Sequence, residues 1–135
     1  MKTIITISLL SVLSFGKTLA QAPTDSEWMN FWENFRGAVN TGVPEKVWDY
    51  MIFPIPGNGV DQESFLVDFG TYFPQSALIG IIEYDPADLV LVENHLDNMD
   101  TNDSKLIRMR IERSGFTSEY YFGRVDDTIY LLDVK

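Results

Sequence analysis

The chain has 135 residues, a formal net charge of −10, one histidine and no cysteine. The lack of cysteine excludes disulfides, thiol nucleophiles and zinc–thiolate sites, and a single histidine excludes metal sites that need two imidazoles. The excess of acidic residues argues against nucleic acid and anionic lipid as partners, because both are bound through basic patches.

Residues 1–20 have the pattern of a secretory signal peptide. Lys2 precedes a short apolar run, and small residues near the end allow cleavage after Ala20 or after Ala22. The run is too short to cross a bilayer as a helix, which takes about 20 apolar residues, so we expect no membrane span. The alternative is a buried N-terminal helix. The pattern predicts an exported protein, periplasmic or secreted.

Residues 21–135 are enough for one domain. Cleavage after Ala20 removes Lys2 and Lys17 but no acidic residue, which leaves 8 basic and 20 acidic residues and a charge of −12. An exported domain without disulfides fits a bacterial cell envelope. The charge would speed the encounter with a cationic partner, and a solvated acidic surface without a partner is the alternative.

The first half of the chain predicts helices. Thr24 and Glu27 have the spacing of a capping box, and Gly42 suits a helix end. A second helix begins at Pro44, and Asp61 caps a third that Pro74 ends. The apolar positions recur at helical spacing in each: Trp28, Phe31, Trp32, Phe35 and Val39; then Val47, Trp48 and Met51; then Phe65, Phe69 and Phe73.

The second half changes to the alternation of strands. Three strands are expected at residues 105–114, 116–125 and 128–135, with turns at Ser114–Gly115 and Val125–Asp126–Asp127. For residues 76–96 we predict two further strands, with a helix beginning at Asp85–Pro86 as the alternative. Helices followed by an antiparallel meander define an α+β fold with the helices on one face of the sheet.

The segments FWENFRGAVNTGVPEKVWDYMIFPI and DQESFLVDF, followed by three closing strands, resemble small exported bacterial domains of the nuclear transport factor two-like (cystatin-like) superfamily. The resemblance covers residues 28–135. It implies a curved, cone-like sheet around a long helix, with an interior that is either packed or open as a pocket. It also implies a possible homodimer. Members include isomerases, dehydratases and binding or accessory domains, so the resemblance does not assign residue roles.

His95 is the weak candidate for a catalytic residue. It could act as a general base oriented by Glu93 or Asp97, with a tyrosine such as Tyr84 or Tyr120 nearby. The alternative is a histidine on a solvent-facing strand edge.

The acidic run after His95 invites comparison with calcium loops, which offer oxygen ligands at fixed positions. No frame through Asp97, Asp100, Asn102 and Asp103 has the central glycine of such a loop. We therefore predict a polar loop between strands and no dedicated metal site, with a weak, adventitious ion site as the alternative.

Basic and aromatic residues alternate along two of the predicted strands. If their faces coincide, they form a strip that binds an anionic or sugar-like ligand, because guanidinium groups fork onto carboxylates. The residues of this candidate strip are Arg108, Arg110, Tyr120 and Arg124. Cross-strand pairing with Glu112 or Glu119 is the alternative.

The sequence contains no glycine-rich phosphate loop, no G-x-S-x-G and no H-E-x-x-H, so we expect no cofactor. The leading hypothesis is a non-enzymatic binding or accessory domain of the bacterial envelope, with an unknown small ligand or protein partner. One alternative is a small lyase or isomerase that uses His95 and a carboxylate in the cone pocket. Another is an acidic inhibitor of a cationic secreted enzyme.

Overall fold

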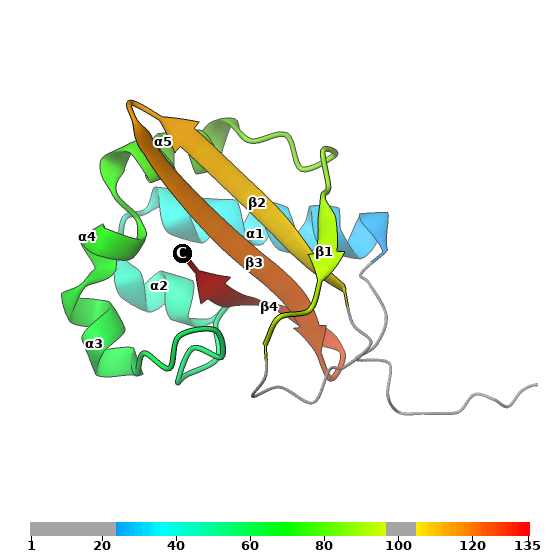
Figure 1. Ribbon diagram of the computed structural model, residues 1–135, viewed down its shortest axis with the longest axis horizontal. Coiled ribbons are helices and arrows are strands. Elements are labelled where there is room, and N and C mark those ends of the chain that lie inside the picture. The colour runs from blue at the N-terminus through cyan, green and yellow to red at the C-terminus, as the bar shows by residue number, and fades with distance from the viewer. Residues whose placement is uncertain (1–23, 97–104) are drawn as a thin grey trace, which may run out of the picture.

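The computed structural model describes residues 24–96 and 105–135, in which five helices precede an open, four-stranded antiparallel sheet of order β1-β2-β3-β4 (Figure 1). The predicted α+β fold, with helices first and a meander last, is confirmed. The segment predicted to be a signal peptide and the acidic run at 97–104 lie outside the described residues. The elements are α1 (Asp25–Asn40), α2 (Pro44–Trp48), α3 (Gln62–Val67), α4 (Phe69–Tyr72), α5 (Gln75–Glu83), β1 (Leu91–Glu93), β2 (Lys105–Arg113), β3 (Phe116–Val125) and β4 (Thr128–Val134).

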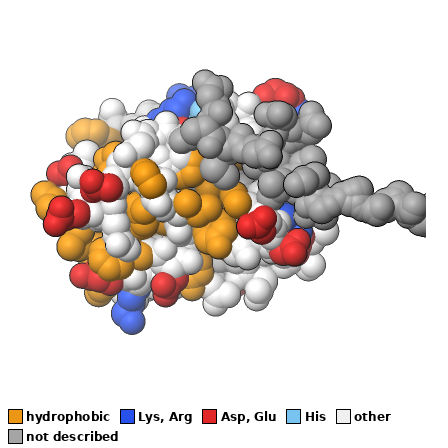
Figure 2. All heavy atoms as spheres, turned by 90° about the horizontal axis from the view of Figure 1, so that it is seen from below, with side chains coloured by type: hydrophobic (Ala, Val, Ile, Leu, Met, Phe, Trp, Pro, Cys, Tyr) orange, Lys and Arg blue, Asp and Glu red, His pale blue; other side chains and the backbone are white. Residues whose placement is uncertain are grey.

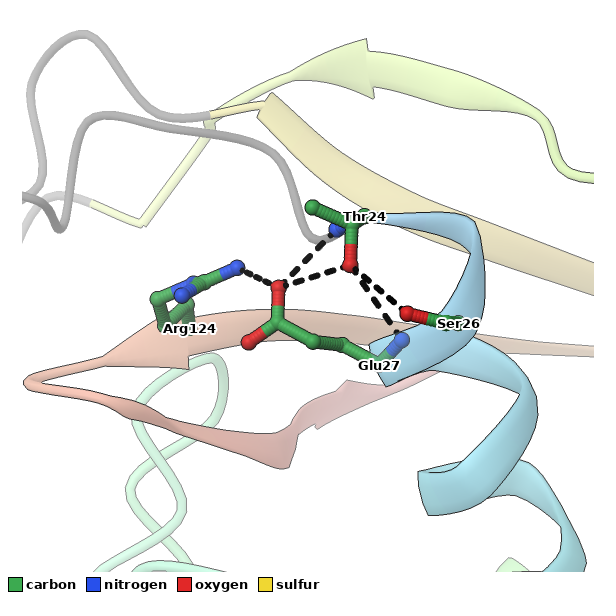
Figure 3. Close-up of polar contacts among 4 residues, drawn as sticks. All are labelled: Thr24, Ser26, Glu27 and Arg124. Atoms are coloured by element: carbon green, nitrogen blue, oxygen red, sulfur yellow. Dashed lines mark hydrogen bonds and ion pairs between the residues drawn. The ribbon is translucent and has the colours of Figure 1, made fainter.

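The predicted capping box begins α1 (Figure 3). The Glu27 backbone N–H donates to the Thr24 hydroxyl at 3.2 Å, and the Thr24 backbone N–H donates to the Glu27 carboxylate at 3.0 Å. Arg124 of β3 forms an ion pair with the same carboxylate. The Thr24 backbone hydrogen bond, with a smaller contribution from Arg124, lowers the pKa of Glu27. One residue thus caps α1 and joins it to the sheet.

The predicted apolar stripe of α1 packs on the sheet face that we call the helix side. Its five members, Trp28, Phe31, Trp32, Phe35 and Val39, are all buried. Phe122 of β3 lies among them, with its ring centroid 5.3 Å from that of Trp28 and 5.2 Å from that of Phe35. Phe65, Phe73 and Tyr120 extend this aromatic core toward α3 and α5.

The strand predicted from Ala77 to Tyr84 is wrong, because residues 75–83 form α5. Its β-branched residues favour a strand locally, but Ala77, Gly80 and Ile81 form a helical stripe that packs on the sheet. A Cβ atom on Gly80 would lie 2.3 Å from Ile111 Cγ2 of β2, so glycine lets the helix approach closely. The second predicted strand is reduced to β1, and the alternative helix at Asp85–Pro86 does not form.

The three terminal strands form the predicted meander with the predicted turns. Ser114 and Gly115 both have positive φ, as a two-residue hairpin turn requires, and Asp126 in the second turn does too. Ile107, Met109 and Ile111 of β2 face the helix side and are buried. The opposite face, which we call the outer face, carries a smaller apolar cluster of Leu96, Leu106, Tyr121 and Leu132.

The free edge of β4 is covered by the chain that follows α2. Met51 forms a parallel bridge with Leu131, and the Gly57 N–H donates to the Leu132 carbonyl at 2.9 Å. This segment contains a cis peptide bond between Phe53 and Pro54. Among the residues that the structure describes, no helix is long and apolar enough to cross a membrane.

Candidate functional site

A row of polar side chains crosses the outer face of the sheet. Residues directly opposite one another in an antiparallel pair point to the same face. Arg108 of β2 is opposite Tyr121 of β3, and Tyr121 is opposite Asp133 of β4. The next row pairs Arg110 with Glu119. Arg108, Tyr121, Asp133, Glu119 and His95 form what we call the outer-face cluster, and Arg110 lies beside it.

His95 joins this cluster from the chain that follows β1. Its Nε2 atom lies 2.8 Å from Oδ2 of Asp133, which is 1% exposed, whereas the His95 side chain is one-third exposed. Because a carboxylate accepts hydrogen bonds, Nε2 donates, and Nδ1 is left facing away from Asp133. The Tyr121 ring packs edge-on against the imidazole, with 4.7 Å between centroids. His95 is therefore held in position by two residues of the sheet.

Tyr121 is the centre of the cluster. Its hydroxyl donates to the Glu119 carboxylate at 2.7 Å, and the Lys135 ammonium lies 5.4 Å from the centre of its ring. Burial, followed by the hydrogen bond to the Glu119 carboxylate, raises the pKa of Tyr121 to about 12.

This pKa predicts a loss of stability in alkali. An unfolded tyrosine ionises near pH 10, whereas folded Tyr121 keeps its proton to about pH 12, so its contribution is complete below pH 10 and disappears as the pH rises through that window. We expect Tyr121→Phe to show a smaller decline in the free energy of unfolding between pH 10 and 12, measured by urea unfolding. An unchanged decline would contradict this assignment.

The two predicted strip arginines of β2 have different surroundings. Arg110 forms ion pairs with Glu112 at 2.7 Å and with Glu119 at 3.9 Å, as the cross-strand alternative predicted. Arg108 has no ion pair with any carboxylate that the structure describes, and its Nε atom is buried without a hydrogen-bond partner. Arg108 is thus the cation of this cluster that has no acidic partner among the described residues.

The other two residues of the predicted strip lie on the helix side, so the four do not form one strip. Tyr120 is fully buried, stacks on Phe73 and donates to the Tyr72 carbonyl at 2.6 Å. Arg124 pairs with Glu27 at the start of α1. The two-residue turn explains the difference, because it places Arg108 opposite Tyr121 rather than Tyr120.

The partners predicted for His95 also differ from those observed. Glu93 pairs with Lys105, and Asp97 lies outside the described residues. Tyr84 packs against Trp32 on the helix side and donates to the Asp88 carbonyl at 2.9 Å. The residue that holds His95 is instead Asp133, which was not predicted from the sequence.

Two grooves lined by described residues lie near the helices and do not include His95. One of about 300 Å³ lies between α1 and the start of β4, and its lining includes the acidic residues Glu27, Asp49 and Asp127. A more apolar one, of about 430 Å³, includes Phe116 and lies at the β2–β3 turn. Within residues 24–96 and 105–135, no three acidic or histidine side chains are arranged to hold a metal ion.

Comparisons with models of known protein families, with curated proteins and with solved structures gave no match for this chain. The case for function therefore depends on the fold and on the outer-face cluster.

Proposed function

We propose that the protein is an exported, non-enzymatic binding or accessory domain of the bacterial cell envelope, and that it binds through the outer face of its sheet. Export rests on the signal-peptide pattern of residues 1–20. The relation to the nuclear transport factor two-like superfamily rests on the resemblance of residues 28–135.

The packing of the helix side favours a surface over an interior pocket. A cone pocket needs free space between α1 and the sheet, and that space is occupied by large side chains. Trp28, Trp32, Phe35 and Phe122 are each 1% exposed or less and are in ring-to-ring contact. A ligand there would have to displace the core that holds the fold together.

The outer-face cluster is the observation that carries the proposal. It combines a partly exposed His95 fixed by a buried carboxylate, an aromatic ring and an arginine without an acidic partner among the described residues. Ligand sites typically combine apolar surface with a few placed polar groups. The half-buried Val92 and Tyr130, which pack against the neighbouring apolar cluster, supply the apolar part.

The test is an NMR titration of the ¹⁵N-labelled protein with three probes, namely N-acetylglucosamine, glucuronate and lysine. We expect shifts in outer-face amides such as those of Arg108, Tyr121 and Asp133. The amides of Phe35 and Phe122 in the core serve as the internal control. Shifts concentrated in the core amides would contradict surface binding.

The lyase or isomerase alternative is favoured by one distance, the 2.8 Å between His95 and Asp133. A carboxylate that fixes the imidazole leaves Nδ1 available to abstract a proton, as in general-base catalysis. The discriminating experiment is hydrogen–deuterium exchange at the methyl group of pyruvate in D₂O. We expect the buffer rate with the protein present. Exchange that the protein accelerates and His95→Gln abolishes would establish the enzymatic alternative.

The acidic-inhibitor alternative is favoured by the groove that includes Glu27, Asp49 and Asp127. The face seen in Figure 2 shows many acidic and few basic side chains around an apolar area. A cationic partner bound in this way would dissociate as salt rises, because exposed charges are screened over about 8 Å at physiological ionic strength.

A further inference from the structure

We propose that the outer-face cluster binds a small molecule with a single carboxylate group, and that the Arg108 guanidinium holds this carboxylate. The inference rests on the proposed binding function and specifies the chemistry of its ligand.

The pairing of the arginines points to Arg108. Four other arginines each have an acidic partner, in the pairs Arg36–Glu33, Arg110–Glu112, Arg113–Glu83 and Arg124–Glu27. Acidic residues outnumber basic ones two to one, so carboxylates are plentiful in this chain. Arg124 also has a buried Nε without a hydrogen bond, but its Nη2 is bonded to Glu27, whereas Arg108 has no described acidic partner. A buried, unpaired N–H of a charged group is costly, and a bound carboxylate would satisfy it.

The neighbours of Arg108 favour an anion at this place. Tyr121 lies directly across the strand pair, with the Lys135 ammonium over its ring. The His95 imidazole contacts the same ring from the side. A guanidinium group and a carboxylate match in geometry through two parallel hydrogen bonds.

The balance of charge favours one carboxylate over a phosphate. Around Tyr121, the cations Arg108 and Lys135 are offset by the acids Glu119 and Asp133. The whole chain carries −10. A dianion would therefore meet repulsion that a monoanion largely avoids.

The surface beside the polar row indicates the rest of the ligand. Leu106 and Leu132 are each 1% exposed, so the apolar surface here comes from the half-buried side chains that pack against them, such as Val92 and Tyr130. This apolar surface lies one row from Arg108 along the strands. It fits an uncharged body, such as a sugar ring, attached to the carboxylate.

The test uses glucuronate as the probe, with glucose as its neutral counterpart and inorganic phosphate as the competing anion. The signals are the Arg108 side-chain Nε–H and the Tyr121 amide in ¹⁵N spectra. Arg110→Gln is the matched control, because it removes the same charge from the same face of the same strand. We expect Arg108→Gln to weaken glucuronate binding by about tenfold or more, and Arg110→Gln by less than about threefold.

Equal losses of glucuronate affinity in Arg108→Gln and Arg110→Gln, or no loss in Arg108→Gln, would show that Arg108 does not hold the carboxylate. Glucose or phosphate binding as tightly as glucuronate would overturn the choice of a carboxylate. Arg108→Lys provides a second variant that keeps the charge, and we expect it to bind less tightly than the wild type because the fork is lost. If glucuronate causes no shift while N-acetylglucosamine shifts outer-face amides, the carboxylate inference fails and the binding function stands.

Discussion

Replacing Phe122 with alanine is expected to lower the free energy of unfolding by about 3–5 kcal/mol, the range for large aromatic residues removed from a core. Phe122 is fully buried and contacts the rings of Trp28, Phe31, Trp32 and Phe35. Its removal leaves a cavity between α1 and the sheet that these rings cannot fill without leaving their own contacts. Urea unfolding followed by tryptophan fluorescence measures the effect.

The matched control for this prediction is Phe116→Ala, which truncates the same residue type on the same strand. Phe116 is 66% exposed, so we expect a change within about 0.5 kcal/mol. A Phe122→Ala effect as small as that of Phe116→Ala would show that the helix side is not the packed core described above.

Replacing Gly57 with alanine is expected to destabilise the fold by about 1–3 kcal/mol, as overpacking does, and to disturb His95 at the same time. A Cβ atom on Gly57 would lie 1.9 Å from Cγ of Asp133. Asp133 is 1% exposed and carries the His95 hydrogen bond, and Gly57 is itself bonded to the Leu132 carbonyl, so neither can move aside easily. The measurements are urea unfolding and the ¹⁵N shifts of the His95 ring.

Gly37→Ala is the control for the second prediction. Nothing lies within 4 Å of a Cβ atom at that helical position, so we expect unchanged or slightly raised stability. Unchanged His95 ring shifts in Gly57→Ala would contradict the view that the segment along β4 fixes the Asp133–His95 pair.

Much of the helical half of the fold was predictable because its signals are local, although the single helix predicted between Asp61 and Pro74 is interrupted at Asp68 and forms α3 and α4. The stripe from Trp28 to Val39 and the Thr24–Glu27 capping box need only spacing along one element, and both occur as expected. The segment that forms α5 was wrongly predicted to be a strand because its isoleucines favour a strand locally. The contact that decides the matter, Gly80 against Ile111, joins residues far apart in the chain.

The candidate site was partly predictable. The sequence analysis identified His95, Arg108 and Arg110. The two-residue turn at Ser114–Gly115 sets the strand register, and this register places Tyr121 opposite Arg108. Counting residues outward along both strands from that turn predicts that Tyr121, and not Tyr120, is the cross-strand neighbour of Arg108. The pairing of His95 with Asp133 depends on how the chain after β1 lies across the sheet, and no local pattern specifies that.

The most direct test of binding through the outer face is a crystal structure of the protein grown with glucuronate. The predicted result is a carboxylate within hydrogen-bond distance of the Arg108 guanidinium, with the sugar ring toward the half-buried Val92 and Tyr130. A ligand inside the aromatic core between α1 and the sheet, or in the groove that includes Asp49, would contradict it.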